Sequence, residues 1–235
     1  MKILIVSATA AEVAPLLSQQ PVEHSKLNSK ISSFKYGSNS VDVMITGAGM
    51  FATAYEMGSW LARRYYDLIL GVGIAGSFNK RTQLGSVVQV QSEQLGDLGI
   101  EEDDGFRPIS QLHFFDPDAF PFSGAQLHSD RFRPTLRSLQ QIPLCSGVSV
   151  NCSSGRASTI RQIVRIFRPD IETMENAGFF YACLSVRQPR FVALRAISNI
   201  IDLRSKQEWD IPLAVNELHK VICSVLDECD KVKQL

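Results

Sequence analysis

Five short apolar runs, separated by segments of a different periodicity, constrain the fold of this chain more than any other feature. Their length and β-branched content are typical of strands that are buried on both faces. The runs are Ile3 to Val6, Val41 to Ile45, Leu68 to Val72, Val87 to Val90 and Phe191 to Leu194. Because strands that alternate with helices pair in a parallel or mixed sheet, the pattern predicts an α/β fold.

The segments between these runs carry helix signals. Apolar residues recur at helical spacing over Thr53 to Tyr65, and Ser158 to Phe167 opens on a capping residue and stops before a proline. Ile211 to Leu226 forms the last predicted helix, and Ile31 to Tyr36 predicts an antiparallel strand. We expect a three-layer α/β/α sandwich with a central mixed sheet, built by residues 1–235 as a single domain.

The charge balance argues against nucleic acid or an anionic membrane as the partner. The 235 residues include 24 Lys and Arg against 24 Asp and Glu, so no net field attracts a polyanion. No apolar stretch reaches the roughly 20 residues of a membrane span. Met1 to Ser7 lacks the features of a signal peptide. We therefore expect a cytoplasmic protein whose partner is a small molecule.

The cysteines and histidines give no metal or disulfide pattern. The five cysteines have no CxxC spacing, and the four histidines stand singly. A catalytic Cys–His pair would need a spatial partner that the sequence does not reveal, and core packing is the simpler interpretation. We expect neither a metal nor a cofactor.

Three loop regions are candidates for ligand contacts. Thr46 to Gly49 and Gly71 to Gly76 are glycine clusters after predicted strands, where the backbone can approach a ligand closely. The second has GxGxxG spacing but no helical pattern after it, so its support for dinucleotide binding is weak. Gly96 to Gly124 lacks periodicity and is predicted to be a long loop over one sheet edge, of the kind that often serves as a lid.

Charged and amide side chains follow two of the expected strands. Glu12 comes just after the first one, where its carboxylate is placed to act as a general base at the mouth of the sheet. The alternative is a first-turn glutamate that stabilises a helix, and Glu175 has the same two interpretations. Arg195 to Asn199 continues the strand of Phe191 to Leu194 toward its carboxyl end, where ligands of open α/β sheets bind.

In their order and spacing, these segments resemble the purine nucleosidase and phosphorylase superfamily over nearly the whole chain. The matching pieces are Met1 to Val6 leading to Glu12, Thr46 to Gly49, Gly73 to Gly76, Met174-Glu175 and Arg195 to Asn199. Within it, the futalosine hydrolases of menaquinone biosynthesis are the most similar. That similarity rests on Gln94 to Gly99, Val148 to Asn151, and Ser198-Asn199 followed by Arg204 and Trp209-Asp210.

The resemblance implies hydrolysis of a purine N-glycosidic bond, without a cofactor or metal, by a homo-oligomer. It implies that Glu12 is the base, that Arg195 helps to hold Glu12 and the water, and that Glu175 and Met174 bind the ribose. Ala75 and Gly76 belong to the same implied substrate site. Loss of a purine passes through an oxocarbenium-like state, which a carboxylate on the ribose stabilises.

Asn199 departs from the adenine-specific nucleosidases, which place there an aspartic acid that protonates purine N7. Asn cannot titrate, but its amide can accept from N7–H and donate to an oxygen at position 6. With Ser198 beside it, we hypothesise hypoxanthine as the leaving base. The alternative is a turn residue at the end of the strand.

Other substrate contacts are carried over from the resemblance. Val150 and Asn151 stand where the methylthioadenosine enzymes stack an aromatic on the base, although Val150 is as well explained by core packing. Ile74 replaces a serine near the water. Futalosine carries an aromatic carboxylate beyond the 5′ carbon, for which Arg204 and Trp209 are candidates. A solvated charge and a packed core residue are their alternatives.

Three other functions stay open from the sequence. Phosphorolysis needs phosphate-binding cations, and neither Ser7 to Glu12 nor the approach to Gly73 supplies an Arg. A nucleosidase for aminodeoxyfutalosine or methylthioadenosine would conflict with Asn199. A purine binder without turnover would not need Glu12, Glu175 and Arg195 together.

Overall fold

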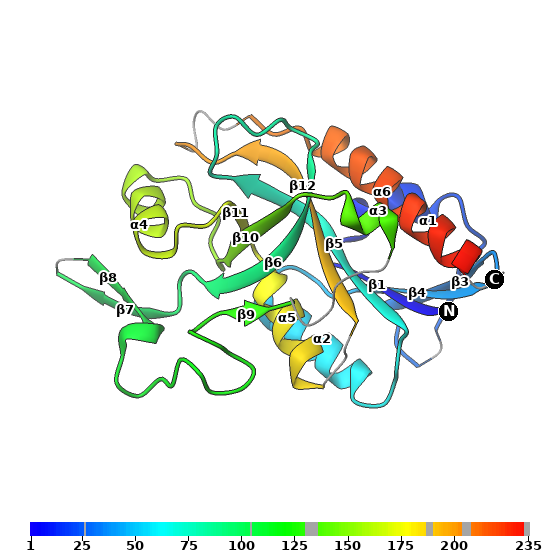
Figure 1. Ribbon diagram of the computed structural model, residues 1–235, viewed down its shortest axis with the longest axis horizontal. Coiled ribbons are helices and arrows are strands. Elements are labelled where there is room, and N and C mark those ends of the chain that lie inside the picture. Colours follow the sequence, from blue (N-terminus) through cyan, green and yellow to red (C-terminus); the bar gives the residue numbers. More distant parts are fainter. Residues whose placement is uncertain (26, 104, 130–135, 187–189, 204–207, 233–235) are drawn as a thin grey trace.

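The structure is a computed structural model that describes residues 1–25, 27–103, 105–129, 136–186, 190–203 and 208–232. In these residues the chain forms one ten-stranded mixed sheet with helices on both sides (Figure 1). Its strands are β1 (Lys2–Ser7), β2 (Glu23–His24), β3 (Ile31–Tyr36), β4 (Asn39–Ile45), β5 (Leu68–Ser77), β6 (Val87–Leu95), β9 (Leu127–His128), β10 (Leu144–Ser149), β11 (Ile171–Thr173) and β12 (Phe191–Ile200). The predicted mixed α/β sheet is confirmed.

The strand order is β11-β10-β6-β12-β5-β1-β4-β3-β2, with β9 paired to β6. Strands β4, β1, β5 and β12 run parallel, whereas β6 runs antiparallel to β12. The predicted antiparallel pairing of β3 with β4 is also present. Strand β11 pairs with β10 and also, antiparallel, with β5, so the sheet closes on itself at this side.

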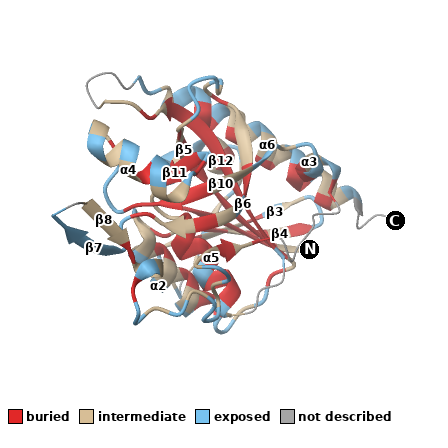
Figure 2. Cartoon of the chain, turned by 60° about the vertical axis from the view of Figure 1, so that its left-hand side comes forward, coloured by how far each residue is buried: buried red, intermediate tan, exposed pale blue. Residues whose placement is uncertain are grey.

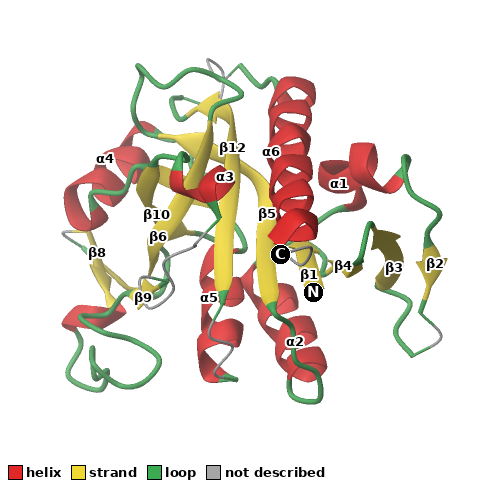
Figure 3. Ribbon diagram, turned by 45° about the vertical axis from the view of Figure 1, so that its right-hand side comes forward, coloured by secondary structure: helices red, strands yellow, loops and turns green. Residues whose placement is uncertain are grey.

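The helices form two outer layers. Helices α1 (Ala10–Leu17), α3 (Arg137–Gln140) and α6 (Ile211–Val232) cover one face, and α1 and α6 lie side by side (Figure 3). Helices α2 (Met50–Leu61) and α5 (Asn176–Ser185) pack together on the other face, and α4 (Ala157–Phe167) lies beside the β10 end of the sheet. No helix among the described residues combines the length and apolarity that crossing a membrane requires.

Each face of the sheet has its own apolar core, because successive side chains of a strand point to opposite faces. Ile3 and Ile5 of β1 pack in the core under α1 and α6, whereas Leu4 and Val6 pack in the core under α2 and α5. Figure 2 shows the strands buried between the helical layers. Two cores on opposite faces define the predicted three-layer sandwich.

The stretch from 96 to 124 differs from the predicted loop. It contains the antiparallel hairpin of β7 (Gly99–Glu102) and β8 (Gly105–Pro108), followed by the 3-10 helix η1 (Ile109–Gln111). All four residues of β7 are exposed, so neither face selects apolar side chains and no alternation marks the strand in the sequence. The prediction of a bare loop was therefore wrong.

Glu93 is a fully buried carboxyl group between β6 and the start of α5. The Ser149 hydroxyl donates to its Oε1, and the same hydroxyl accepts the Ala177 amide at the start of α5. Within the described part of the chain, Glu93 Oε2 has no hydrogen-bond partner. Burial therefore raises the pKa of Glu93 from its usual 4.5 to about 8.

Gly178 sets how closely α5 approaches α2. A Cβ at this position would overlap the carbonyl oxygen of Met50, which is backbone and cannot rotate away. We expect Gly178→Ala to lower the free energy of unfolding by about 1–3 kcal/mol, as overpacking does. Gly58→Ala in α2 is the matched control, because a Cβ there meets nothing within 4 Å. It should stabilise by up to about 1 kcal/mol, and urea unfolding of both variants checks the pair.

Glu93 should make stability depend on pH. Its raised pKa means that the folded state holds a proton that the unfolded state releases, so stability falls as pH rises from about 5 to about 8. Glu93→Gln should remove this slope and gain a few kcal/mol over the wild type at pH 8. Urea unfolding across this pH range tests it, with exposed Glu23→Gln as the control. A variant that keeps the wild-type slope would contradict the assignment.

Candidate active site

A pocket of about 350 Å³ lies at the carboxyl ends of β1, β5 and β12. The segment after β11 and the first turn of α6 form further parts of its wall. Eight residues that the sequence predicted for the site line it together: Glu12, Ala75, Gly76, Met174, Glu175, Ser198, Asn199 and Trp209. The structure thus brings segments that are far apart in the chain to one edge of the sheet, where parallel strands leave a crevice.

Glu12 is held in one orientation by four donors. It is the third residue of α1 and accepts the backbone amide of Thr9, which caps the helix. The hydroxyls of Thr9 and Ser7 donate to the same Oε2 at 2.9 and 3.1 Å, and the Ile74 amide donates to Oε1 at 3.1 Å. Ile74 thus contributes its backbone, which any side chain would allow.

Glycine at position 73 keeps the space beside Glu12 open. A Cβ there would lie 2.7 Å from Glu12 Oε1 and 3.6 Å from the Arg195 guanidinium. The two charged groups therefore converge where β5 has no side chain. The glycine cluster of the sequence serves this approach, inside a strand rather than in a turn after one.

Arg195 is only 3% exposed and lies behind Glu12. Burial lowers its pKa, and the charges of Glu175, Glu12 and Glu93 oppose that shift. Glu12, Glu175 and Arg195 line a cavity of about 10 Å³, the size of one water molecule. Glu12 and Glu175 also line the larger pocket, so a molecule in the small cavity would lie next to the pocket.

Glu175 precedes α5 and accepts the Gly49 amide at 2.9 Å. Gly49 has φ +93°, which aims this amide at the carboxylate from the Thr46 to Gly49 turn. Burial raises the pKa of Glu175, and the Gly49 amide and the Arg195 charge work against that rise. Both predicted glycine clusters therefore contact a predicted carboxylate.

Asn199 lies at an irregularity of β12. The pairing with β5 shifts between Ile197 and Asn199, which brings Asn199 opposite Gly76. The Ser198 hydroxyl lies 3.0 Å from Asn199 Oδ1 and 3.2 Å from the Ala75 carbonyl oxygen, so it donates to both acceptors. The Nδ2 group of Asn199 lies beside Gly76. Asn199 also forms an antiparallel bridge with Trp209, which is 40% exposed and lines the pocket.

Two sequence-predicted residues in the described part of the chain, Val150 and Asn151, lie away from this pocket. Val150 is buried in a small core with Val148 and Ile163, and Asn151 donates its backbone and side-chain amides to Asp97. The prediction that Val150 and Asn151 contact the base was wrong, because the strand end turns them toward β7 and α4. Arg204 lies outside the described residues.

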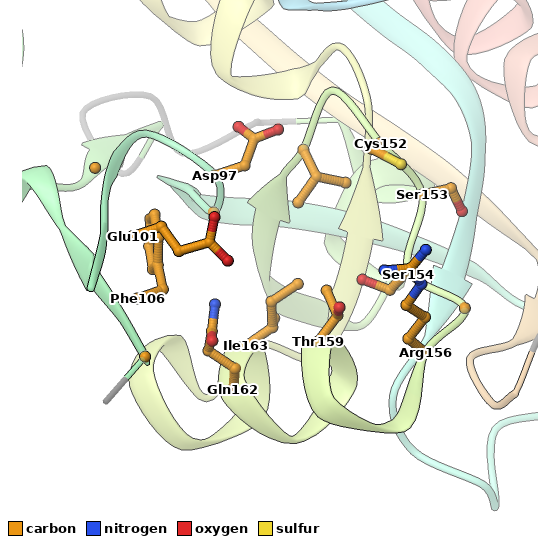
Figure 4. A pocket seen from close by; sticks show the side chains of 15 residues that line it. Asp97, Glu101, Phe106, Cys152, Ser153, Ser154, Arg156, Thr159, Gln162 and Ile163 are labelled. Carbon is orange, nitrogen blue, oxygen red and sulfur yellow. The ribbon is translucent and has the colours of Figure 1, made fainter. Parts of the chain in front are cut away.

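Val150 instead lines a second, larger cavity of about 930 Å³ (Figure 4). Asp97, Glu101 and Phe106 face it from the hairpin side, and the residues of α4 face it from the other. No described residue from 96 to 124 lines the pocket of Glu12, so the expected lid borders the second cavity instead. Ser153 lines both spaces and separates them.

Sequence reasoning missed Glu172, a buried carboxylate that also lines the pocket. It lies two residues before Met174, and alternation in an extended segment places such residues on one face. The spacing of two residues from the predicted Met174 was the sequence signal that could have identified Glu172 as a pocket residue. Among the described residues no cluster of three or more His, Cys, Asp or Glu is arranged to hold a metal ion.

Known proteins with similar sequences and folds show which family this chain belongs to. A futalosine hydrolase of Acidothermus cellulolyticus is 27% identical over 237 residues, which cover 96% of this chain and 90% of that protein. The 5′-methylthioadenosine/S-adenosylhomocysteine nucleosidase of Campylobacter jejuni superposes with a TM-score of 0.75 at 19% identity, covering 98% and 99% of the two chains. A futalosine hydrolase mutant of Helicobacter pylori gives 0.73 at 17%, with coverages of 98% and 99%.

At these identities the two solved structures show a shared fold, which confirms the nucleoside phosphorylase-like architecture. The family model that describes the Phosphorylase superfamily matches residues 2–227, nearly the whole length. The chain therefore belongs to the Phosphorylase superfamily.

Proposed function

We propose that this protein is a futalosine hydrolase, which cleaves the N-glycosidic bond of futalosine with water and releases hypoxanthine, a step of menaquinone biosynthesis. The observation that carries the proposal is the cavity of one-water size between Glu12, Glu175 and Arg195, directly beside the pocket. The similarity to the futalosine hydrolase of Acidothermus cellulolyticus supports the choice of substrate.

In the proposed reaction a water in this cavity attacks the C1′ carbon of the ribose. Glu12 takes a proton from the water, and its four donors hold the carboxylate in the orientation that this transfer needs. The bond between C1′ and the purine nitrogen N9 breaks as the new C1′–O bond forms, and its electron pair leaves with the base. The base takes up one proton at N7, which balances the proton that water gives to Glu12. Positive charge develops on the sugar, and Glu175 stabilises it through the ribose hydroxyls.

Asn199 stabilises the leaving base rather than protonating it. Its Oδ1 has a second lone pair beyond the one that Ser198 uses, and accepts from N7–H, while Nδ2 donates to the oxygen at position 6. Adenine presents an amino group at position 6, which would face Nδ2 donor to donor. The amide therefore favours a 6-oxopurine.

Phosphorolysis is disfavoured by the charges around the pocket. Among the described lining residues there is no Lys or Arg, and the charged ones are Glu12, Glu172 and Glu175. A phosphate ion beside the ribose would face carboxylates without a cation in direct contact. Neutral water has no such penalty.

We also place a contact between copies of this chain on the face formed by α2, α5 and the segment after η1. Large apolar side chains are exposed there: Phe51, Tyr55, Phe114, Phe120 and Tyr181. Apolar surface of this kind is typical of a protein interface. A homo-oligomer would cover it.

The function is tested by identifying the released base. The purified protein is incubated with futalosine, aminodeoxyfutalosine, methylthioadenosine and inosine, each with and without phosphate, and the products are separated by chromatography. We expect hypoxanthine from futalosine, at a rate independent of phosphate. Release that needs phosphate would identify a phosphorylase, preferred release of adenine would overturn the substrate, and no release would indicate a binding protein.

Removing the proposed base should leave the fold intact. Glu12→Gln keeps an acceptor for the helix cap, so its unfolding midpoint should stay near the wild type. The kcat for futalosine should fall by about 10²- to 10⁴-fold, the usual contribution of a general base. Glu217→Gln, a change in the surface ion pair with Lys220, is the control and should alter kcat less than about twofold. A Glu12 variant with near wild-type kcat would exclude Glu12 as the base.

A further inference from the structure

Glu172 is a carboxylate in the pocket that the proposed reaction does not use. It is 5% exposed, lies on β11, and lines the same pocket as Asn199. Burying a carboxylate costs free energy unless donors compensate it. A pocket-lining acid that is kept buried therefore calls for a role in ligand binding or in holding the wall.

The sheet fixes Glu172 relative to Asn199. Gly76 of β5 pairs with Glu172 of β11 on one side and with Asn199 of β12 on the other. Residues directly opposite each other in a sheet point to the same face, and neighbouring strands lie about 4.8 Å apart. Glu172 and Asn199 thus flank a glycine without a side chain, with their backbones roughly 10 Å apart.

Donors from Ser153 and Ser154 orient the Glu172 carboxylate, with the Ser153 side chain adding to two bonds from Ser154. The Ser154 amide donates to Oε1 at 2.8 Å and the Ser154 hydroxyl donates to Oε2. Ser153 and Ser154 also border the second cavity (Figure 4). A carboxylate has about four acceptor sites, so Glu172 keeps one acceptor site for a ligand after the bonds from Ser153 and Ser154.

The hydrogen-bonding groups of the purine base indicate which of its atoms Glu172 would bind. In hypoxanthine the groups along one edge are N7, the oxygen on C6, and N1–H, whereas adenine N1 carries no hydrogen and is an acceptor. If Asn199 takes N7 and the oxygen, the next group along the edge is N1–H, on the side away from N7. Glu172 is the acceptor that lines the pocket across Gly76 from Asn199.

We propose that Glu172 determines base specificity by accepting a hydrogen bond from N1–H of a 6-oxopurine. This rests on the proposed function. An adenine base would place its N1 lone pair against the carboxylate, so Glu172 rejects it independently of Asn199. Sites that leave such groups unpaired can discriminate by up to about 10⁴- to 10⁵-fold.

The test compares kcat/KM for futalosine and aminodeoxyfutalosine, which differ only in the purine, in the wild type and Glu172→Gln. The Gln amide can also donate to adenine N1, so the ratio of the two values should fall by about 10- to 10³-fold. The change should come mainly from a lower kcat/KM for futalosine. An unchanged ratio, or an equal loss for both substrates, would overturn the proposal and make Glu172 a structural wall residue.

Asp170→Asn is the matched control. Asp170 accepts the amide and hydroxyl of Ser146 much as Glu172 accepts those of Ser154, but it is exposed and does not line the pocket. Its ratio should equal that of the wild type. If the wild type releases no base from futalosine, the proposed function fails. If it does and Glu172→Gln keeps the wild-type ratio, only the role of Glu172 fails.

A second measurement uses only the wild type and therefore tests the proposal even if Glu172→Gln does not fold. Free hypoxanthine and 1-methylhypoxanthine, in which N1–H is replaced, are compared as inhibitors of the wild type. We expect the methylated base to inhibit at least about tenfold more weakly, since its N1 can no longer donate. Equal inhibition by the two bases would overturn the proposal.

Discussion

The site depends on close approach to a central strand that lacks side chains at three positions. These positions on β5 are Gly71, Gly73 and Gly76. A Cβ at each would lie 2.7 Å from another group: the ring of Phe179 in α5, the carboxylate of Glu12, and the side chain of Ile201. Three separate elements can therefore reach the strand, and they are the ones that carry or adjoin Glu175, Glu12 and Asn199.

In the described part of the chain, the site contains one buried cation and several buried carboxyl groups. One guanidinium, Arg195, interacts with Glu175, Glu12 and Glu93, so carboxylates outnumber it. Burial raises the pKa of Glu93 to about 8, which leaves that group largely neutral near neutral pH. Arg195 is then shared by the two carboxylates that also line the pocket. Removing one member of such a group leaves a buried charge unpaired, which costs free energy.

Much of the fold was predictable from periodicity because its strands are buried on both faces. The runs at Ile3 to Val6 and Phe191 to Leu194 became the cores of β1 and β12, and Ile31 to Tyr36 became β3 with the expected pairing. Strand β7 left no such signal, since all four of its residues are exposed. Alternation of apolar residues reflects burial of one strand face, so it cannot identify a strand whose two faces are both exposed.

The site was predictable where position along one strand decides it and less so where loops decide it. Glu12 and Glu175 follow strand ends, Asn199 lies near the end of β12, and the sheet brings those ends together. Val150 and Asn151 follow β10, whose direction relative to the pocket depends on pairings that a single sequence does not display. Glu172 reaches the pocket because β11 pairs with β5. This pairing joins segments far apart in the chain, so no local sequence pattern predicts it.

Glu12 is at once the α1 residue that completes the capping box with Thr9 and the carboxylate that lines the one-water cavity. Its Oε2 accepts the Thr9 amide of the first turn, so fraying of that turn would release the carboxylate from its fixed orientation. Fraying of the first turn of a helix requires much less free energy than global unfolding. Molecules with α1 frayed would therefore remain folded by most spectroscopic measures and yet lack the oriented carboxylate that we propose as the base. The fraction of active enzyme would be set by one eight-residue helix rather than by the stability of the whole domain.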